Sequence, residues 1–107
     1  MTATFEAREA IMYVLITYDV STVSPEGRRR LRRVARVCEN FGQRVQLSVF
    51  ECDVGDTDMV KLRHQLLEEM NPHEDSIRFY FLGEDPSKRV EHHGQRPSID
   101  YNDALIV

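Results

Sequence analysis

Residues 12–19 of this 107-residue chain read MYVLITYD, and this stretch is the strongest indication of the fold. It is dense in β-branched and aromatic side chains and ends in an acid, which is typical of a central strand buried on both faces. Residues 20–24 then form a loop, in which Ser24 and Pro25 supply the N-cap and the first-turn proline of a helix. A strand, a loop and a helix are therefore expected at the start of the fold.

That helix is predicted from Pro25 to about Phe41, with Gly42 as the residue that ends it. Its apolar positions are three and four residues apart, so they share one face that packs on a core. They are Leu31, Val34, Ala35, Cys38 and Phe41.

Residues 44–54 alternate as a strand does but are long for one, so we expect the segment to bend or split near Ser48. The later elements follow in order: a turn at 55–58, an amphipathic helix with Met59, Leu62, Leu66 and Met70 buried, a clear strand at 76–82 and a weaker one at 88–93. Counting the middle segment as two strands gives βαββαβ, the ferredoxin-like arrangement of an α/β (α+β) domain.

The length suits one domain, predicted over residues 12–107 after an N-terminal extension at 1–11. The terminal ALIV, residues 104–107, is too apolar for water and is expected to add a strand, either to the sheet of its own chain or to the sheet edge of a partner subunit. No apolar run approaches the ~20 residues that span a bilayer, and no signal-peptide pattern is present, so we expect a cytoplasmic protein without membrane contact. Cys38 and Cys52 form no CxxC motif and are predicted to be buried, reduced thiols.

The net charge of −4 argues against a nucleic-acid partner, but the distribution of charge argues for one. Half of the 14 basic residues are arginines within one segment: Arg28, Arg29, Arg30, Arg32, Arg33, Arg36 and Arg44. Glu39 is the only acid in that segment, so few partners lie along the helix. Guanidinium groups match phosphate oxygens bidentately, whereas the alternative is a solvated helix face. The candidate phosphate contacts on the helix are Arg28, Arg29, Arg32, Arg33 and Arg36.

Asp19 stands where the apolar strand meets its loop, a position at which α/β folds place reactive groups. The alternative is that Asp19 caps the loop by accepting backbone N–H bonds. One carboxylate makes a poor Mg²⁺ site, but a two-fold dimer would bring two copies of Asp19 together. A divalent cation between them would remove their repulsion, polarise a phosphodiester and activate a bound water.

A third cluster comprises Arg44, Gln46, Ser48 and Phe50, which share one side of the sheet if the strand is unbroken. The cluster would face a nucleic-acid backbone or base; alternatively, Phe50 belongs to the core and Arg44 is a rim charge. The histidines His64, His92 and His93 are predicted to be exposed, since no Cys or His spacing suggests zinc.

These residues carry a family resemblance. The strand ending in YDV, the helix GRRRLRRVARVCENFG, the segment RVQLSVFEC and the later FYFLG resemble the Cas-two family of CRISPR-associated proteins, over roughly residues 12–93. The resemblance implies a ferredoxin-like homodimer that acts in spacer acquisition, bound to the integrase subunit Cas-one. It also implies a Mg²⁺-dependent endonuclease acting on single-stranded RNA or duplex DNA, with Asp19 as the catalytic metal ligand and Arg44 and Phe50 as functional residues. The N-terminal extension departs from the family pattern.

Two functions are compatible with this resemblance. One is a metal-dependent nuclease, and the other is a non-catalytic scaffold that clamps DNA with arginines and bridges integrase subunits. A ribonuclease toxin of similar fold and a ligand-binding regulatory domain account less well for the arginine stripe. The glycine-aromatic-glycine signature of an RNA-recognition domain is absent.

Overall fold

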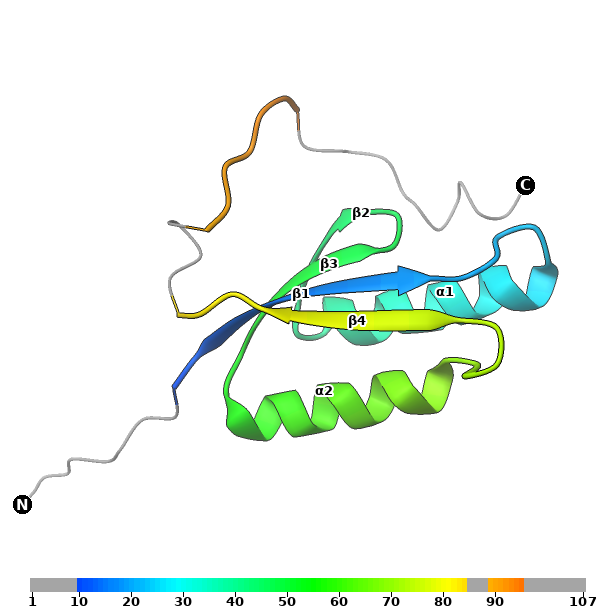
Figure 1. The fold of residues 1–107 in the computed structure, drawn as a ribbon, viewed down its shortest axis with the longest axis horizontal. Helices are drawn as coiled ribbons and strands as arrows, with labels where there is room; N and C mark the ends of the chain where they lie inside the picture. The colour runs from blue at the N-terminus through cyan, green and yellow to red at the C-terminus, as the bar shows by residue number, and fades with distance from the viewer. Residues whose placement is uncertain (1–9, 85–88, 96–107) are drawn as a thin grey trace, which may run out of the picture.

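The computed structural model describes residues 10–84 and 89–95. Its elements follow in the order β1 (Met12–Asp19), α1 (Pro25–Glu39), β2 (Gly42–Gln46), β3 (Val49–Val54), α2 (Asp56–Glu69) and β4 (Ser76–Phe81). The four strands form one sheet in the order β2-β3-β1-β4, and every pair of neighbours is antiparallel. This is the predicted ferredoxin-like βαββαβ arrangement (Figure 1).

Strand β1 lies at the centre of the sheet, and its alternating side chains divide the molecule into two faces. Val14, Ile16 and Tyr18 are buried beneath the helices. Leu15 and Thr17 are only half-buried on the other face, which we call the open face. Tyr13 is buried on the open face, but the expectation that the strand is buried on both faces was wrong for Leu15, Thr17 and Asp19. Both helices pack on the same side of the sheet, so neither covers these residues (Figure 1).

Helix α1 begins as its sequence predicts. The Ser24 hydroxyl accepts a hydrogen bond from the Gly27 N–H at 3.0 Å, and Pro25 occupies the first turn. The buried face of α1 carries Leu31, Val34, Ala35 and Cys38, all from the predicted stripe.

The end of α1 differs from the prediction. The helix ends at Glu39, Asn40 caps it in a right-handed conformation, and Gly42 is the first residue of β2. A Cβ on Gly42 would lie 2.1 Å from the Glu51 carbonyl oxygen and 2.6 Å from the Cys52 Cα. The glycine is therefore required for the close approach of β2 to β3 and does not end the helix.

The middle segment splits as predicted, with β2 and β3 joined by a turn at Leu47 and Ser48. The pairing between the two strands shifts register between Arg44 and Gln46. Helix α2 buries Met59, Leu62 and Leu66 as expected. The same expectation was wrong for Met70, which is half-buried at the C-cap, because the helix ends at Glu69.

The predicted strand at 88–93 was wrong for its described part: residues 89–93 adopt no regular structure. This polar stretch is exposed and pairs with no strand among the residues that the structure describes, which removes the burial that would favour a strand. The predicted strand at 104–107 and most of the extension at 1–11 lie outside the described residues. None of the described helices has the length and apolar character needed to cross a membrane.

Both thiols are buried and unpaired, as predicted. Burial raises the pKa of Cys52 to about 12 and that of Cys38 further still. These groups belong to the core and carry no chemistry at neutral pH.

Candidate functional site

Asp19 is the last residue of β1 and is exposed on the open face, where its Cα partner is Ser76 of β4. Its carboxylate makes no hydrogen bond or ion pair with any described residue. The loop that follows is capped by Ser21, which accepts from the Val23 N–H, and by Ser24. The described residues therefore give no support to the loop-capping alternative for Asp19, whose carboxylate is exposed among them.

The donor chemistry of Asp19 fits a magnesium ligand, since Mg²⁺ prefers carboxylate oxygens supplemented by water. Within residues 10–84 and 89–95, however, no group of three or more His, Cys, Asp or Glu side chains could hold a metal ion. Among the residues that the structure describes, Asp19 is therefore not part of a ready-made metal site.

Directly beneath Asp19, on the helix-covered face, lies a hydrogen-bonded network that the sequence analysis missed. The Tyr18 hydroxyl donates to Oδ2 of Asp75, the residue that precedes β4. Arg30 of α1 donates to both oxygens of the same carboxylate, from Nε at 2.8 Å and from Nη2 at 3.0 Å. The Asn71 N–H adds a fourth hydrogen bond at 2.9 Å. One carboxylate thereby joins β1, α1 and the loop between α2 and β4.

The network fixes the protonation state of its members. Burial alone would raise the pKa of Asp75, but hydrogen bonds from Arg30, Tyr18 and the Asn71 N–H outweigh burial and lower that pKa. Burial and the neighbouring Asp75 carboxylate both raise the pKa of Tyr18. At neutral pH the network therefore holds a carboxylate, a guanidinium and a neutral phenol.

The loop after Asp19 is held against α1 as well. The Arg28 guanidinium donates to the carbonyl oxygens of Thr22 at 3.0 Å and Val23 at 2.8 Å. Gly27 lies so close to the loop that a Cβ on it would be 1.8 Å from the Ser21 carbonyl oxygen. Arg28, which was predicted to contact phosphate, thus donates its hydrogen bonds to backbone carbonyl oxygens of the loop.

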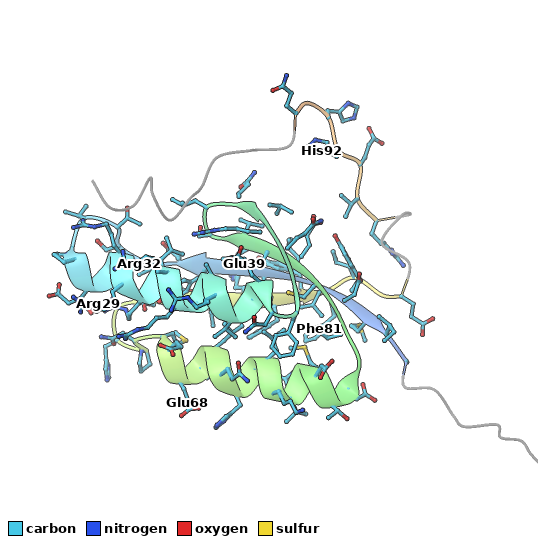
Figure 2. The ribbon with its side chains drawn as sticks, turned by 180° about the vertical axis from the view of Figure 1, so that it is seen from behind. Arg29, Arg32, Glu39, Glu68, Phe81 and His92 are labelled. Atoms are coloured by element: carbon cyan, nitrogen blue, oxygen red, sulfur yellow. The ribbon has the colours of Figure 1, made fainter. Side chains whose placement is uncertain are left out.

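The outward side of α1 carries four arginines without a partner among the described residues. They make no hydrogen bond or ion pair with the part of the chain that the structure describes: Arg29, Arg32, Arg33 and Arg36. We call these four residues the basic face. Arg29, Arg33 and Arg36 are exposed and Arg32 is half-buried. Figure 2 looks onto this side of the helix and labels Arg29 and Arg32. The face extends over about 10 Å of helix, at 1.5 Å per residue.

The predicted cluster on the middle segment does not form as expected. Arg44 and Phe50 are Cα partners across β2 and β3, and Cζ of Arg44 lies 5.7 Å from the centroid of the Phe50 ring. Phe50 is fully buried, as the core alternative predicts, so its ring offers no surface to a base. Arg44 is half-buried, and its Nε donates to the Leu47 carbonyl oxygen at 2.8 Å. Because the strand ends at Gln46 and Ser48 lies in the turn, the four residues do not share one side of a strand.

The histidines are exposed, as predicted. Nε2 of His64 lies 2.9 Å from Oε1 of Glu68 on α2, and Nε2 of His93 lies 2.5 Å from Oε2 of Glu91. His92 and His93 border a groove on the open face together with Leu15, Val49 and Glu51. None of these imidazoles is within a described cluster of metal-binding type.

Comparison with known proteins gives a consistent result. The family model for CRISPR associated protein Cas2 matches residues 12–90. A Chlorobaculum tepidum protein named CRISPR-associated endoribonuclease Cas2 is 57% identical over 96 residues, which cover 90% of this chain and 100% of the relative. A Halalkalibacterium halodurans protein named CRISPR-associated endonuclease Cas2 is 52% identical over 95 residues, covering 89% and 99% of the two chains. The crystal structure of Streptococcus pyogenes Cas2 at pH 6.5 is similar with a TM-score of 0.72 at 52% identity, and covers 78% of this chain and 100% of that one.

Proposed function

Since this chain belongs to the CRISPR-associated protein Cas2 family, we propose that it is a homodimeric, metal-dependent endonuclease that hydrolyses phosphodiester bonds in single-stranded RNA or duplex DNA. The observation that carries the proposal is the exposed Asp19 carboxylate, which has no partner among the described residues and stands at the end of a central strand. The names of the relatives, endoribonuclease and endonuclease, support the same class of reaction.

The open face of the sheet supports the homodimer. It carries Asp19 together with the half-buried Leu15, Thr17 and Val49, so its centre is partly apolar, and neither of the two described helices covers it. Two copies that pack these faces together bury that surface and bring their Asp19 carboxylates toward the same axis. Two bare carboxylates repel each other, and a divalent cation between them relieves the repulsion.

Asp19 from each subunit would hold Mg²⁺, which when bound supplies a Lewis acid for the phosphoryl oxygen and lowers the pKa of a coordinated water. Substrate binding and orientation are supplied by the side chains of the protein. The basic face of α1 holds phosphate oxygens, and the strand end keeps Asp19 at a constant distance from them.

A scaffold role in spacer acquisition is the second candidate. It is favoured by a contrast within the described part of the chain: four arginines have no partner there, whereas Asp19 stands without a second acidic or histidine ligand group. In that role the dimer clamps DNA with the basic face and bridges the integrase subunit Cas-one. The two roles differ in whether Asp19 is required.

The substitution Asp19→Asn separates them. With end-labelled single-stranded RNA and duplex DNA in Mg²⁺, we expect this variant to lose at least about 100-fold in cleavage rate, the range for a group acting directly on the reaction. Its affinity for the same substrates, measured by fluorescence anisotropy, is expected to stay within twofold.

Asp58→Asn is the matched control, because Asp58 is an exposed aspartate on α2. This variant should cleave at the wild-type rate. Wild-type cleavage by Asp19→Asn would refute the nuclease proposal, and retention of spacer integration with Cas-one by that variant would assign the cellular role to the scaffold.

A further inference from the structure

Asp19 belongs to the last residue pair of the β1/β4 ladder. Its Cα partner is Ser76, and beyond this pair both strands turn into loops. Terminal pairs of a ladder fray, because ladder hydrogen bonds hold them on one side only. A carboxylate that must meet a metal ion together with a second copy therefore needs additional support at this position.

The support lies on the opposite face of the same strand ends. Tyr18 precedes Asp19 in β1, and Asp75 is the residue just before Ser76, the first residue of β4. The hydrogen bond from Tyr18 to Asp75 therefore joins the ends of the two strands next to the terminal pair. Tyr18 is 2% exposed and the Asp75 side chain is fully buried, so water does not compete for this bond.

Arg30 ties the same point to α1. Its guanidinium donates one hydrogen bond to each oxygen of the Asp75 carboxylate, and a bidentate contact of this kind fixes the orientation of both groups. The Arg30 side chain is 15% exposed. Helical spacing explains why Arg30 differs from its neighbours: a turn of 100° per residue directs Arg30 to Asp75 and leaves Arg29 and Arg33 on the outward side. Arg28 is likewise occupied, with the loop carbonyls of Thr22 and Val23.

We propose that Tyr18, Asp75 and Arg30 form a positioning unit that fixes Asp19 relative to the basic face, and that Arg30 consequently holds no phosphate. The arginines of α1 thus have two separate tasks. Arg28 and Arg30 fix the strand end and the loop after it, and the basic face binds nucleic acid. The part that concerns cleavage rests on the proposed role of Asp19, whereas the assignment of Arg30 does not.

The first test removes one hydroxyl with Tyr18→Phe, which leaves the buried ring in place. Hydrogen–deuterium exchange is read at residues 17–20, where the residue 18 N–H donates to the Ser48 carbonyl oxygen at 3.0 Å in the wild type. We expect exchange at these amides to accelerate about tenfold, which is the effect of losing one hydrogen bond of ordinary strength. Cleavage should fall about tenfold or more in kcat, because misplacement of a reacting group by 1 Å costs up to about 100-fold, while the nucleic-acid Kd stays within twofold.

The matched control is Tyr13→Phe, at the other end of the same strand, where the hydroxyl interacts with Glu51. Exchange at 17–20 and kcat should both remain at wild-type values in this variant. Unchanged exchange in Tyr18→Phe would overturn the proposal. It would also be overturned if exchange in this variant accelerated while kcat stayed at the wild-type value, or if only the nucleic-acid affinity were lost.

The second test uses binding alone. Arg30→Ala should leave the Kd for duplex DNA and its salt dependence near those of the wild type, whereas Arg33→Ala should weaken binding and reduce the salt slope by about 1. Equal losses in the two variants would refute the assignment of Arg30. Should Asp19→Asn cleave normally, the nuclease proposal fails, while the exchange and binding results still decide the positioning unit.

Discussion

Nε of Arg30 lies 2.8 Å from Oδ2 of Asp75, although the two residues are 45 positions apart in the chain. This contact joins the arginine-rich helix to the loop that starts β4, and through Tyr18 it reaches the strand that ends in Asp19. Hydrogen bonds therefore link the strand that carries the candidate reactive carboxylate to the candidate phosphate-binding helix.

Asp75→Asn is expected to destabilise the fold by about 3 kcal/mol at pH 7, because removal of one member of a buried ion pair leaves the other without its charge partner. The folded state lowers the pKa of Asp75, so the stability gained from ionisation is complete above about pH 4, the ordinary aspartate value, and is lost as pH falls through the folded value. Urea denaturation from pH 7 to pH 2.5 should show the gap between wild type and variant closing as the solution becomes acidic.

Glu74→Gln is the control for that series, because Glu74 meets the same Arg30 at 3.4 Å but has a side chain that is 65% exposed. Its loss should stay below about 0.5 kcal/mol. A gap between wild type and Asp75→Asn that does not change with pH would contradict the assigned ionisation of Asp75.

The basic face makes nucleic-acid affinity dependent on salt. If its four arginines each neutralise one phosphate, log affinity for duplex DNA should fall with log salt at a slope near −3.6 per chain. The double variant Arg29→Ala/Arg33→Ala should reduce the slope by about 2, measured by fluorescence anisotropy between about 50 and 200 mM salt.

Arg63→Ala serves as the comparison for the basic face. Arg63 is an exposed arginine of α2, with Cζ 6.0 Å from the centroid of the Phe79 ring. Its removal should leave the slope unchanged. A slope near zero in the wild type would separate α1 from nucleic-acid binding altogether.

Gly27→Ala should disturb the loop that follows Asp19. The new methyl group would meet the Ser21 carbonyl oxygen at 1.8 Å, so the loop must move away from α1. We expect a loss of about 2 kcal/mol in unfolding free energy, the usual range for overpacking, together with reduced cleavage.

Glu26→Ala, an exposed change in the same turn of α1, controls for an effect on the helix itself. It should cost at most about 1 kcal/mol, the value of an acidic residue near a helix N-terminus. Wild-type stability of Gly27→Ala would show that the loop is not fixed as the structure describes.

The thiols should resist labelling. Cys38 and Cys52 are fully buried and burial raises both pKa values, that of Cys52 to about 12, so a disulfide reagent at pH 8 should react with neither in the native protein. Both should react rapidly in urea. Fast labelling of either thiol without denaturant would indicate that the packing of α1 on β3 opens readily.

Local sequence patterns predicted the elements that depend on neighbouring residues. The β-branched run ending in Asp19 and the Ser24–Pro25 start of α1 lie where expected, because propensity and capping act over a few positions. Gly42 was misassigned, since its need for a bare Cα arises from β3, which is remote in sequence.

The residues of the candidate site were likewise predictable only where their role depends on neighbouring positions in the sequence. Asp19 and the outward arginines could be named from the sequence, but no local signal connects Arg30 with Asp75 or distinguishes Arg28 from Arg29. Phe50 is central in the core because β3 lies between β1 and β2, and that order is a property of the whole sheet. Side-chain assignments that depend on such long-range pairings require the structure.

The pairing of two Asp19 carboxylates around one ion is tested most directly by a crystal structure of the protein grown with Mn²⁺. We expect a dimer joined through its open faces, with one anomalous peak lying about 2.1 Å from a carboxylate oxygen of each Asp19, the octahedral distance for an ion of this class. A monomer, or a dimer whose Asp19 carboxylates are too far apart to share an ion, would contradict it.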